Sequence, residues 1–144
     1  MPQLSESIVI HADRAKIWQL LTTPSDILRW FAGLDSLDAA PNYPAVGSTI
    51  TGAYKVMGIE LKATQTVIAA TEGESLRYTL EGVVNGTQNW SLNATDNGVE
   101  LTMAMDYSMS GGVLGKLAEP AVHSVNVTNA KKSLESLKML AENE

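Results

Sequence analysis

His123 is the residue of this sequence whose position and chemistry best suit hydrogen-bonding or acid–base work on a ligand. Counting 3.6 residues per turn from Pro120 places it on the same helical face as five apolar residues, Val127, Ala130, Leu134, Leu137 and Ala141. That face is expected to pack on the rest of the protein, where a neutral imidazole could donate a hydrogen bond or a proton to a ligand carbonyl. A structural histidine bonded to a backbone carbonyl is the alternative. As a catalytic candidate His123 is incomplete, because the sequence reveals no orienting partner for it.

A second candidate surface is the apolar face of the predicted strand that ends at Met109. Alternate residues along this strand, Leu101, Met103, Met105, Tyr107 and Met109, share one face, and more polar residues occupy the other. Methionine side chains are flexible and polarizable, which suits a wall that contacts ligands of variable shape. Ordinary core packing explains the same pattern, so both interpretations stay open. Tyr107 and Met109 are expected nearest the open end of the sheet.

Aromatic residues complete the predicted ligand-binding set. Tyr54, Tyr78 and Tyr107 each fall in a predicted strand, where a phenol can bond to the backbone or hold the polar end of a ligand. Tyr78 alternates with polar neighbours and should point inward. Trp30, at the end of a short helix, can either gate a cavity or plug the core. The predicted ligand-binding residues are Trp30, Tyr54, Tyr78, Met103, Met105, Tyr107, Met109, His123 and Val127.

Several chemistries lack their sequence signatures. The chain has no cysteine and two histidines at distant positions, 11 and 123, and no acidic cluster has the spacing of a calcium loop. Gly111, Gly112 and Gly115 are not followed by the Lys-Ser/Thr pair of a phosphate-binding loop, and no Gly-x-Ser-x-Gly motif occurs. We therefore predict no metal, no cofactor and no serine nucleophile.

Composition indicates one acidic globular domain over residues 1–144. With 44% hydrophobic residues the chain can bury a sizeable core, and its net charge of −6 disfavours nucleic acid as a partner. No secretory signal and no apolar run of membrane-spanning length are apparent, and a chain without cysteine is compatible with a reducing compartment. The expected location is the cytoplasm, without stable membrane insertion.

The predicted elements at the N-terminus are one strand and two short helices. The strand covers residues 4–10, and Asp13 offers a side-chain cap for the first helix. Thr23, Pro24 and Asp26 read as the cap, first position and first-turn acid of a second helix, which Gly33 ends.

The remainder of the chain predicts a sheet followed by a long helix. From Asp35 to Met109, β-branched residues and recurring turn signals indicate about six antiparallel strands. The three glycines at 111, 112 and 115 should release the last strand, and the helix is expected from Pro120 to Glu142.

Six segments of this pattern resemble the START and Bet v 1 superfamily, and within it the polyketide cyclase and dehydrase group. They are Ile17-Trp18-Gln19-Leu20-Leu21, Trp30, Gly47-Ser48, the Asn85–Leu92 stretch, Leu114-Gly115-Lys116-Leu117 and the Ser133–Lys138 stretch. The resemblance implies an α+β helix-grip fold, in which a curved seven-stranded antiparallel sheet wraps around the C-terminal helix, with two short helices after the first strand. No universal catalytic motif joins the members of this superfamily.

Three functions follow as hypotheses. The leading one is binding or carriage of a hydrophobic small molecule, lipid- or polyketide-like, in an internal cavity. A cyclase or dehydratase that uses His123 and an inward tyrosine in the same cavity is the alternative, and a protein-interaction or activator module is the third. An internal cavity of about 300 Å³ or more would favour the first two over the third. The sequence leaves the oligomeric state open.

Overall fold

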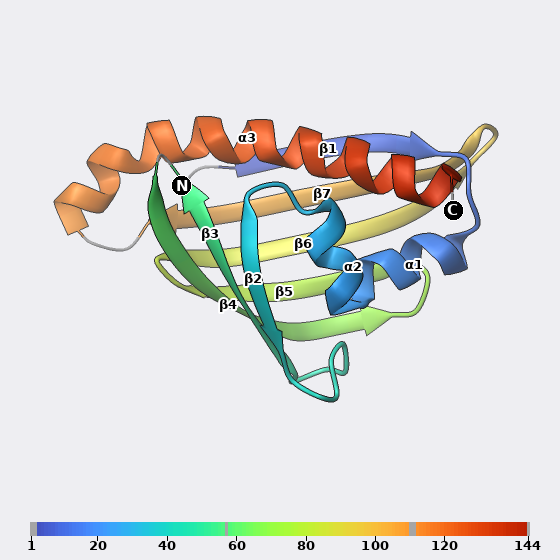
Figure 1. Ribbon diagram of the computed structural model, residues 1–144, viewed down its shortest axis with the longest axis horizontal. Coiled ribbons are helices and arrows are strands. Elements are labelled where there is room, and N and C mark those ends of the chain that lie inside the picture. The colour runs from blue at the N-terminus through green and yellow to red at the C-terminus, as the bar shows by residue number, and fades with distance from the viewer. Residues whose placement is uncertain (1–2, 57, 110–111, 144) are drawn as a thin grey trace.

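The computed structural model describes residues 3–56, 58–109 and 112–143 (Figure 1). Its elements run in the predicted order of one strand, two short helices, six strands and a long helix. They are β1 (Gln3–Ile10), α1 (Arg14–Thr22), α2 (Pro24–Trp30), β2 (Leu34–Ala39), β3 (Thr49–Val56), β4 (Ile59–Thr71), β5 (Ser75–Gly82), β6 (Val84–Thr95), β7 (Gly98–Met109) and α3 (Gly112–Asn143). The predicted α+β helix-grip fold is confirmed.

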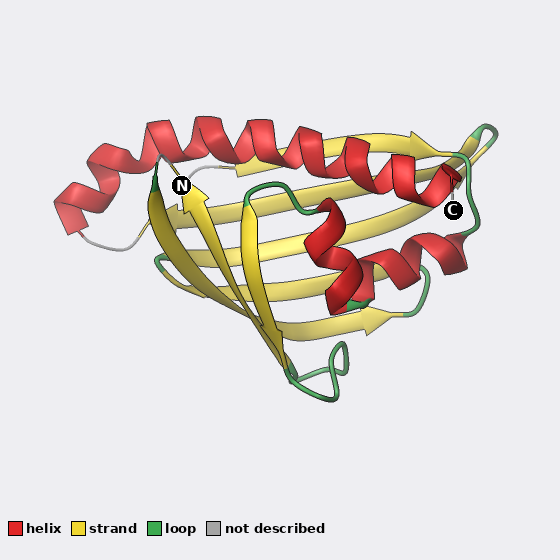
Figure 2. Cartoon of the chain, viewed as in Figure 1, coloured by secondary structure: helices red, strands yellow, loops and turns green. Residues whose placement is uncertain are grey.

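All seven strands form one antiparallel sheet in the order β1-β7-β6-β5-β4-β3-β2. Only β1 is out of chain order, because it pairs with β7. The sheet curls around α3, which lies along β1 and β7. Helices α1 and α2 occupy the concave side beside the C-terminal half of α3 (Figures 1 and 2). One helix alone cannot fill the concave side of a sheet that curls this strongly. A cavity can therefore form on that side.

Inward-facing residues are set by the strand register. Leu4, Met105, Gln88, Tyr78 and Val67 lie opposite one another across five strands and form one row. The predicted alternation in β5 is confirmed, since Leu76, Tyr78 and Leu80 are buried and Arg77 and Glu81 are exposed.

The buried face of α3 contains the residues that its period predicted. Ala130, Leu134, Leu137 and Ala141 are at most 5% exposed and pack with sheet residues such as Leu101 in the main core. The helix begins at Gly112, however, and not at Pro120 as predicted. Tertiary contacts override the weak local propensity here, because the Glu119 carboxylate accepts a hydrogen bond from the backbone N–H of Met109 at 3.2 Å.

The two short helices begin where predicted, with Asp13 and Thr23 at their N-cap positions, but without the side-chain bonds expected of a cap. The Asp13 carbonyl accepts the first backbone bonds of α1, and the Thr23 carbonyl does the same for α2. Pro24 in the first turn of α2 is confirmed, with Asp26 beside it. Among the described residues, no helix is both long enough and apolar enough to cross a bilayer.

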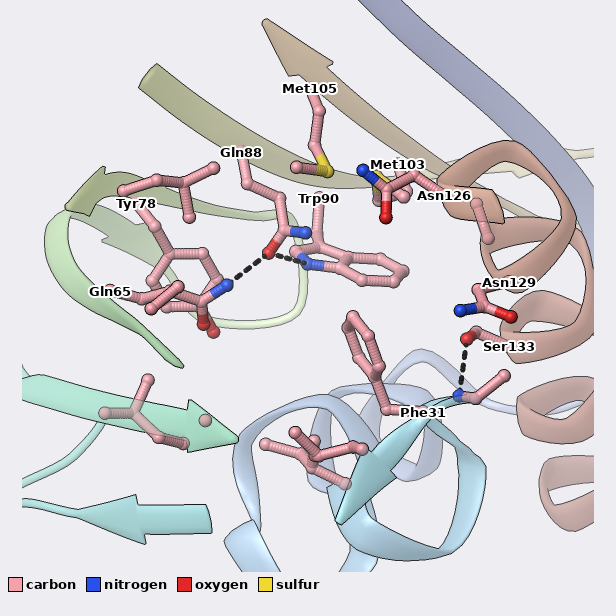
Figure 3. Close-up of a pocket in the computed structure, with 18 of the residues that line it drawn as sticks. Phe31, Gln65, Tyr78, Gln88, Trp90, Met103, Met105, Asn126, Asn129 and Ser133 are labelled. Atoms are coloured by element: carbon pink, nitrogen blue, oxygen red, sulfur yellow. Dashed lines mark hydrogen bonds between the residues drawn. The ribbon is translucent and has the colours of Figure 1, made fainter. Parts of the chain in front are cut away.

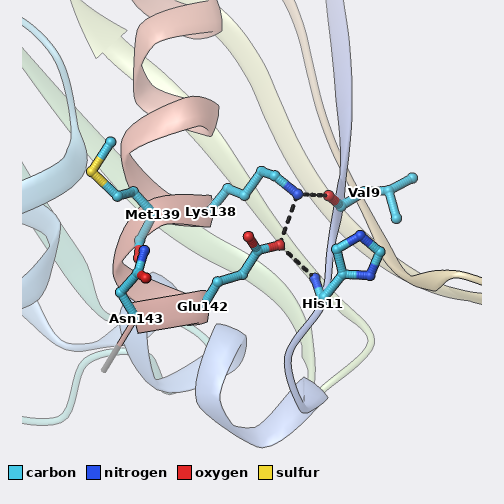
Figure 4. A network of polar contacts seen from close by, with 6 residues as sticks. All are labelled: Val9, His11, Lys138, Met139, Glu142 and Asn143. Carbon is cyan, nitrogen blue, oxygen red and sulfur yellow. Dashed lines mark hydrogen bonds and ion pairs between the residues drawn. The ribbon is translucent and has the colours of Figure 1, made fainter.

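The C-terminal end of α3 is attached to the end of β1 by a small polar network (Figure 4). Lys138 Nζ donates to the Val9 carbonyl at 2.7 Å and to Glu142 Oε2 at 2.7 Å, and the same carboxylate oxygen accepts the His11 backbone N–H at 2.8 Å. The hydrogen bond from His11, followed by that from Lys138, lowers the pKa of Glu142. His11 itself is exposed and lies between β1 and α1.

This network predicts a small acid-sensitive contribution to stability. The pKa of Glu142 is lower in the folded protein than its ordinary value of 4.5, so the contribution is complete above that value and is lost as the pH falls through the folded pKa. The variant Glu142→Gln should have a slightly lower melting temperature than the wild type at pH 7, and the difference in melting temperature should shrink toward pH 3. Thermal melts across this range test it. Glu135→Gln, an exposed change on the same helix, serves as the control, and an undiminished difference at pH 3 would contradict the assignment.

Candidate ligand-binding cavity

A cavity of about 90 Å³ lies between the concave face of the sheet, the middle of α3 and the corner where α2 leads into β2 (Figure 3). Its wall is mainly apolar and draws on strands β1 to β7 and on helices α1 to α3. Apolar lining residues include Leu4, Leu21, Ile27, Leu34, Ile50, Leu80, Val84, Met103 and Met105. The volume is smaller than the criterion of about 300 Å³ set above.

Small residues explain why space remains in this part of the interior. Gly52 of β3, Ala63 of β4 and Ala130 of α3 all line the cavity, where larger side chains would fill it. Ala63 and Ala130 are 7% and 5% exposed, so their methyl groups face the interior and not solvent. The cavity therefore depends on residue size at a few positions on different elements.

Aromatic rings form one side of the cavity. The lining includes Trp30 and Phe31 at the end of α2 and Trp90 of β6. The Trp30 and Trp90 rings pack edge to face, with their centroids 5.4 Å apart. Trp30 is 3% exposed, and its indole N–H donates to the Leu20 carbonyl at 2.8 Å. Trp30 is thus both packed in the core and part of the wall. Trp90, which is 3% exposed, is likewise both packed in the core and part of the wall.

Two glutamines place amide groups inside the cavity wall. Gln88 is 2% exposed, and its Oε1 accepts from Gln65 Nε2 at 2.9 Å and from the Trp90 indole N–H at 3.4 Å (Figure 3). Both glutamines line the cavity. They were missed from the sequence, although Gln88 occupies an inward position in β6, between apolar inward residues at 84 and 90. That alternation was the available signal.

A pair of phenols lies beside these amides. Tyr78, directly opposite Gln88 in the sheet register, exchanges a hydrogen bond with the hydroxyl of Tyr43 from the β2–β3 loop, and the two rings are parallel. Burial raises the pKa of Tyr43 to about 12, and burial with the neighbouring Tyr43 raises the pKa of Tyr78 well above its ordinary value. Both phenols are therefore neutral at physiological pH. Tyr43 was missed from the sequence, because a loop residue has no periodicity to indicate which way it points.

The α3 helix contributes a polar stripe to the opposite wall. Asn126, Asn129 and Ser133 line the cavity at helical spacing. Ser133 is 2% exposed, and its hydroxyl accepts the backbone N–H of Ala32 at 2.8 Å, which joins α3 to the α2–β2 corner (Figure 3).

His123 does have a side-chain partner. The Tyr107 hydroxyl lies 2.7 Å from His123 Nδ1, and Asn126 Nδ2 donates to the same hydroxyl at 3.1 Å. Tyr107 is fully buried, and burial raises its pKa. This arrangement replaces the backbone carbonyl that was the alternative partner for a structural histidine. Tyr107 and His123 are not among the cavity-lining residues, whereas Asn126 is, so Asn126 connects the pair to the cavity.

The structure thus divides the predicted ligand-binding residues into groups. Trp30, Tyr78, Met103 and Met105 line the cavity. Met109 packs with Tyr107 in a small satellite cluster, and Val127 packs against the main core. The side chain of Tyr54 lies outside the described part of the chain. Ligand contact by any of these residues stays a prediction.

A curled seven-stranded sheet around a long C-terminal helix, with a lined internal cavity, makes this chain a helix-grip protein. It belongs to the family of polyketide cyclase / dehydrase and lipid transport proteins, whose sequence profile matches residues 1–142. A comparison with curated proteins gave no significant sequence match.

Solved structures share the fold at low sequence identity. A protein from Thermus thermophilus is 16% identical with a TM-score of 0.84, covering 99% of this chain and 100% of that one. The Zhui aromatase/cyclase from Streptomyces sp. R1128 is 13% identical with a TM-score of 0.83, covering 98% and 93%. The Aha1 dimer from Colwellia psychrerythraea is 18% identical with a TM-score of 0.69, covering 99% and 98%. Identities this low establish the fold alone.

Proposed function

We propose that this protein binds a hydrophobic small molecule, lipid- or polyketide-like, in the cavity between α3 and the sheet. The observation that carries the proposal is an interior space with mostly apolar walls and a few buried polar groups, at the place where a packed core would otherwise be continuous. Ligand sites in proteins commonly combine these two features. Membership of a family described by polyketide cyclase, dehydrase and lipid transport functions supports the same class of ligand.

The size of the cavity adds a condition. At about 90 Å³ it is smaller than the roughly 150 Å³ cavity that holds benzene in an engineered protein, so the walls must move apart to admit a ligand. Met103 and Met105 are suited to this because methionine has three rotatable side-chain bonds and a polarizable sulfur. Binding is therefore expected to be coupled to repacking of the β7 face.

A cyclase or dehydratase reaction is the second candidate, because His123 and Tyr107 form a hydrogen-bonded pair beside the cavity. Neither residue lines the cavity, although Asn126, which donates to the Tyr107 hydroxyl, does. General acid–base chemistry needs contact at about 3 Å with the reacting group. Binding is accordingly the function that we propose.

Filling the cavity tests the proposal. In the variant Ala63→Leu, the added carbons would occupy most of the space, so binding of the neutral probe N-phenyl-1-naphthylamine should weaken at least tenfold while the fold persists. Ala69→Leu, an exposed change on the same strand, should bind the probe like the wild type. Fluorescence titrations measure both, and circular dichroism checks the fold.

Two results would contradict the proposed function. One is a wild-type protein that binds no apolar probe and carries no extractable molecule in native mass spectrometry after purification from its host. The other is equal probe binding by Ala63→Leu and the wild type, since the probe would then occupy a different surface.

A further inference from the structure

We infer that the cavity selects an uncharged ligand that carries a hydroxyl or carbonyl group, and that Gln88 and Gln65 recognise this group. The inference rests on the proposed binding function and names the chemical class of the ligand. It depends on which atoms of the two amides remain available, on the phenols next to them and on the charge of the lining.

The orientation of the two amides follows from the Trp90 indole. An indole nitrogen can only donate a hydrogen bond, so the Gln88 atom that faces Trp90 Nε1 must be the oxygen. The same oxygen faces Gln65, so the Gln65 atom that points at it must be the amide nitrogen. The hydrogen-bond partners thus determine both amide flips.

This orientation leaves one amide nitrogen and one amide oxygen without protein partners. Among the described residues, nothing accepts a hydrogen bond from Gln88 Nε2 and nothing donates to Gln65 Oε1. Gln88 is 2% exposed, so bulk water does not readily serve its amide nitrogen. The nitrogen is not one of the fully inaccessible polar atoms that lack a partner, and Gln88 lines the cavity, so a ligand oxygen there can accept its hydrogen bond.

The two phenols extend this polar end of the cavity. In a hydrogen bond between two hydroxyls only one hydrogen is used, so whichever of Tyr43 and Tyr78 donates, the other retains a hydrogen for a ligand. Tyr78 lies directly opposite Gln88 across β5 and β6, so its side chain and the amide belong to the same inward row. Donors and acceptors therefore gather at this end, and apart from Asn126, Asn129 and Ser133 of α3 the remaining lining residues are apolar.

The charge of the lining excludes ionised ligand groups from this end. None of the described residues that line the cavity is Asp, Glu, Lys, Arg or His. Burial keeps the phenols neutral, since it raises the pKa of both. A carboxylate placed here would lose its hydration without gaining an opposite charge, which is strongly unfavourable. A neutral hydroxyl or carbonyl has no such penalty and matches the available donor and acceptor.

Three probes of similar size test the inference on the whole protein: 2-naphthol, naphthalene and 2-naphthoate. Titrations followed by calorimetry or NMR should show 2-naphthol binding about fivefold more tightly than naphthalene, the gain typical of one buried hydrogen bond. They should show 2-naphthoate at pH 8 binding at least about a hundredfold more weakly than 2-naphthol, because its charge is buried without a partner.

Variants assign the preference to the amides. In Gln88→Met the preference for 2-naphthol over naphthalene should disappear. Gln65→Met, a change at a partly exposed residue, should reduce the preference in the same direction and provides the test if Gln88→Met does not fold. Met105→Leu, which changes the apolar lining only, is the control and should keep the ratio even if both affinities change.

The outcomes separate the two proposals. If naphthalene binds but 2-naphthol binds no better, or 2-naphthoate binds as well as 2-naphthol, the inference is overturned and the binding function stands. The inference is also overturned if the preference survives in both glutamine variants. If none of the three probes binds, the proposed function fails and the inference fails with it.

Discussion

The variant Gly86→Ala is expected to lose about 4 kcal/mol of unfolding free energy, because steric clash and backbone strain act together. Gly86 has a φ of 148°, and a Cβ atom built there would lie 2.0 Å from the carbonyl oxygen of Asp106 and 2.8 Å from the Tyr107 Cα. Both atoms belong to the backbone of β7, so they cannot rotate away. Denaturant unfolding followed by circular dichroism measures the loss.

Gly86 also shapes the cavity side of the sheet. It lies in register between Leu80 of β5 and Tyr107 of β7, where an inward side chain would otherwise stand. Its unusual backbone brings β6 against β7, which is how glycine commonly introduces curvature into a sheet.

Gly73→Ala is the matched control for the glycine variant. Gly73 has a φ of 75° in the β4–β5 turn, but nothing lies within 4 Å of a Cβ built there. This variant should therefore lose about 1 kcal/mol of unfolding free energy, from backbone strain alone. Equal losses for the two alanine variants would mean that the close approach of β6 and β7 contributes nothing.

The variant Trp30→Ala is expected to lose about 4 kcal/mol of stability and to gain the ability to bind larger ligands. The indole is almost fully buried, contacts the Trp90 and Phe31 rings and donates a hydrogen bond to the Leu20 carbonyl. Its removal deletes these contacts and joins the space of the indole to the existing cavity, because Trp30 is part of the lining. Unfolding measurements and binding of a four-ring apolar probe, pyrene, to the variant and the wild type test both effects.

Trp18→Ala separates loss of a ring from loss of the cavity wall. Trp18 lies on α1, is only partly buried and is not among the described residues that line the cavity. Its removal should cost less than about 2 kcal/mol and leave pyrene binding unchanged. If Trp30→Ala destabilised the protein no more than Trp18→Ala and admitted no larger probe, Trp30 would be neither a packed residue nor a wall.

Much of the fold could be predicted because local patterns and packing agree. Alternation in β5 and β7 indicated which residues face inward, and the spacing of Leu134, Leu137 and Ala141 indicated the buried face of α3. The start of α3 could not be predicted, since Gly112 and Pro120 are poor helix residues and their local signal points to a loop. Contacts such as the one between Glu119 and Met109 stabilise the helix there.

The candidate site also has a part that could be predicted from the sequence and a part that could not. Periodicity by itself determined that Tyr78, Met103 and Met105 face inward, because a strand turns alternate side chains to one side whatever the rest of the protein does. Which inward residues meet around an unfilled space depends on sheet curvature and on the position of α3, and these are properties of the whole fold. The Gln65–Gln88 contact, the pairing of Tyr43 with Tyr78 and the partner of His123 were therefore decided only in the tertiary structure, where residues distant in the chain come within hydrogen-bonding distance.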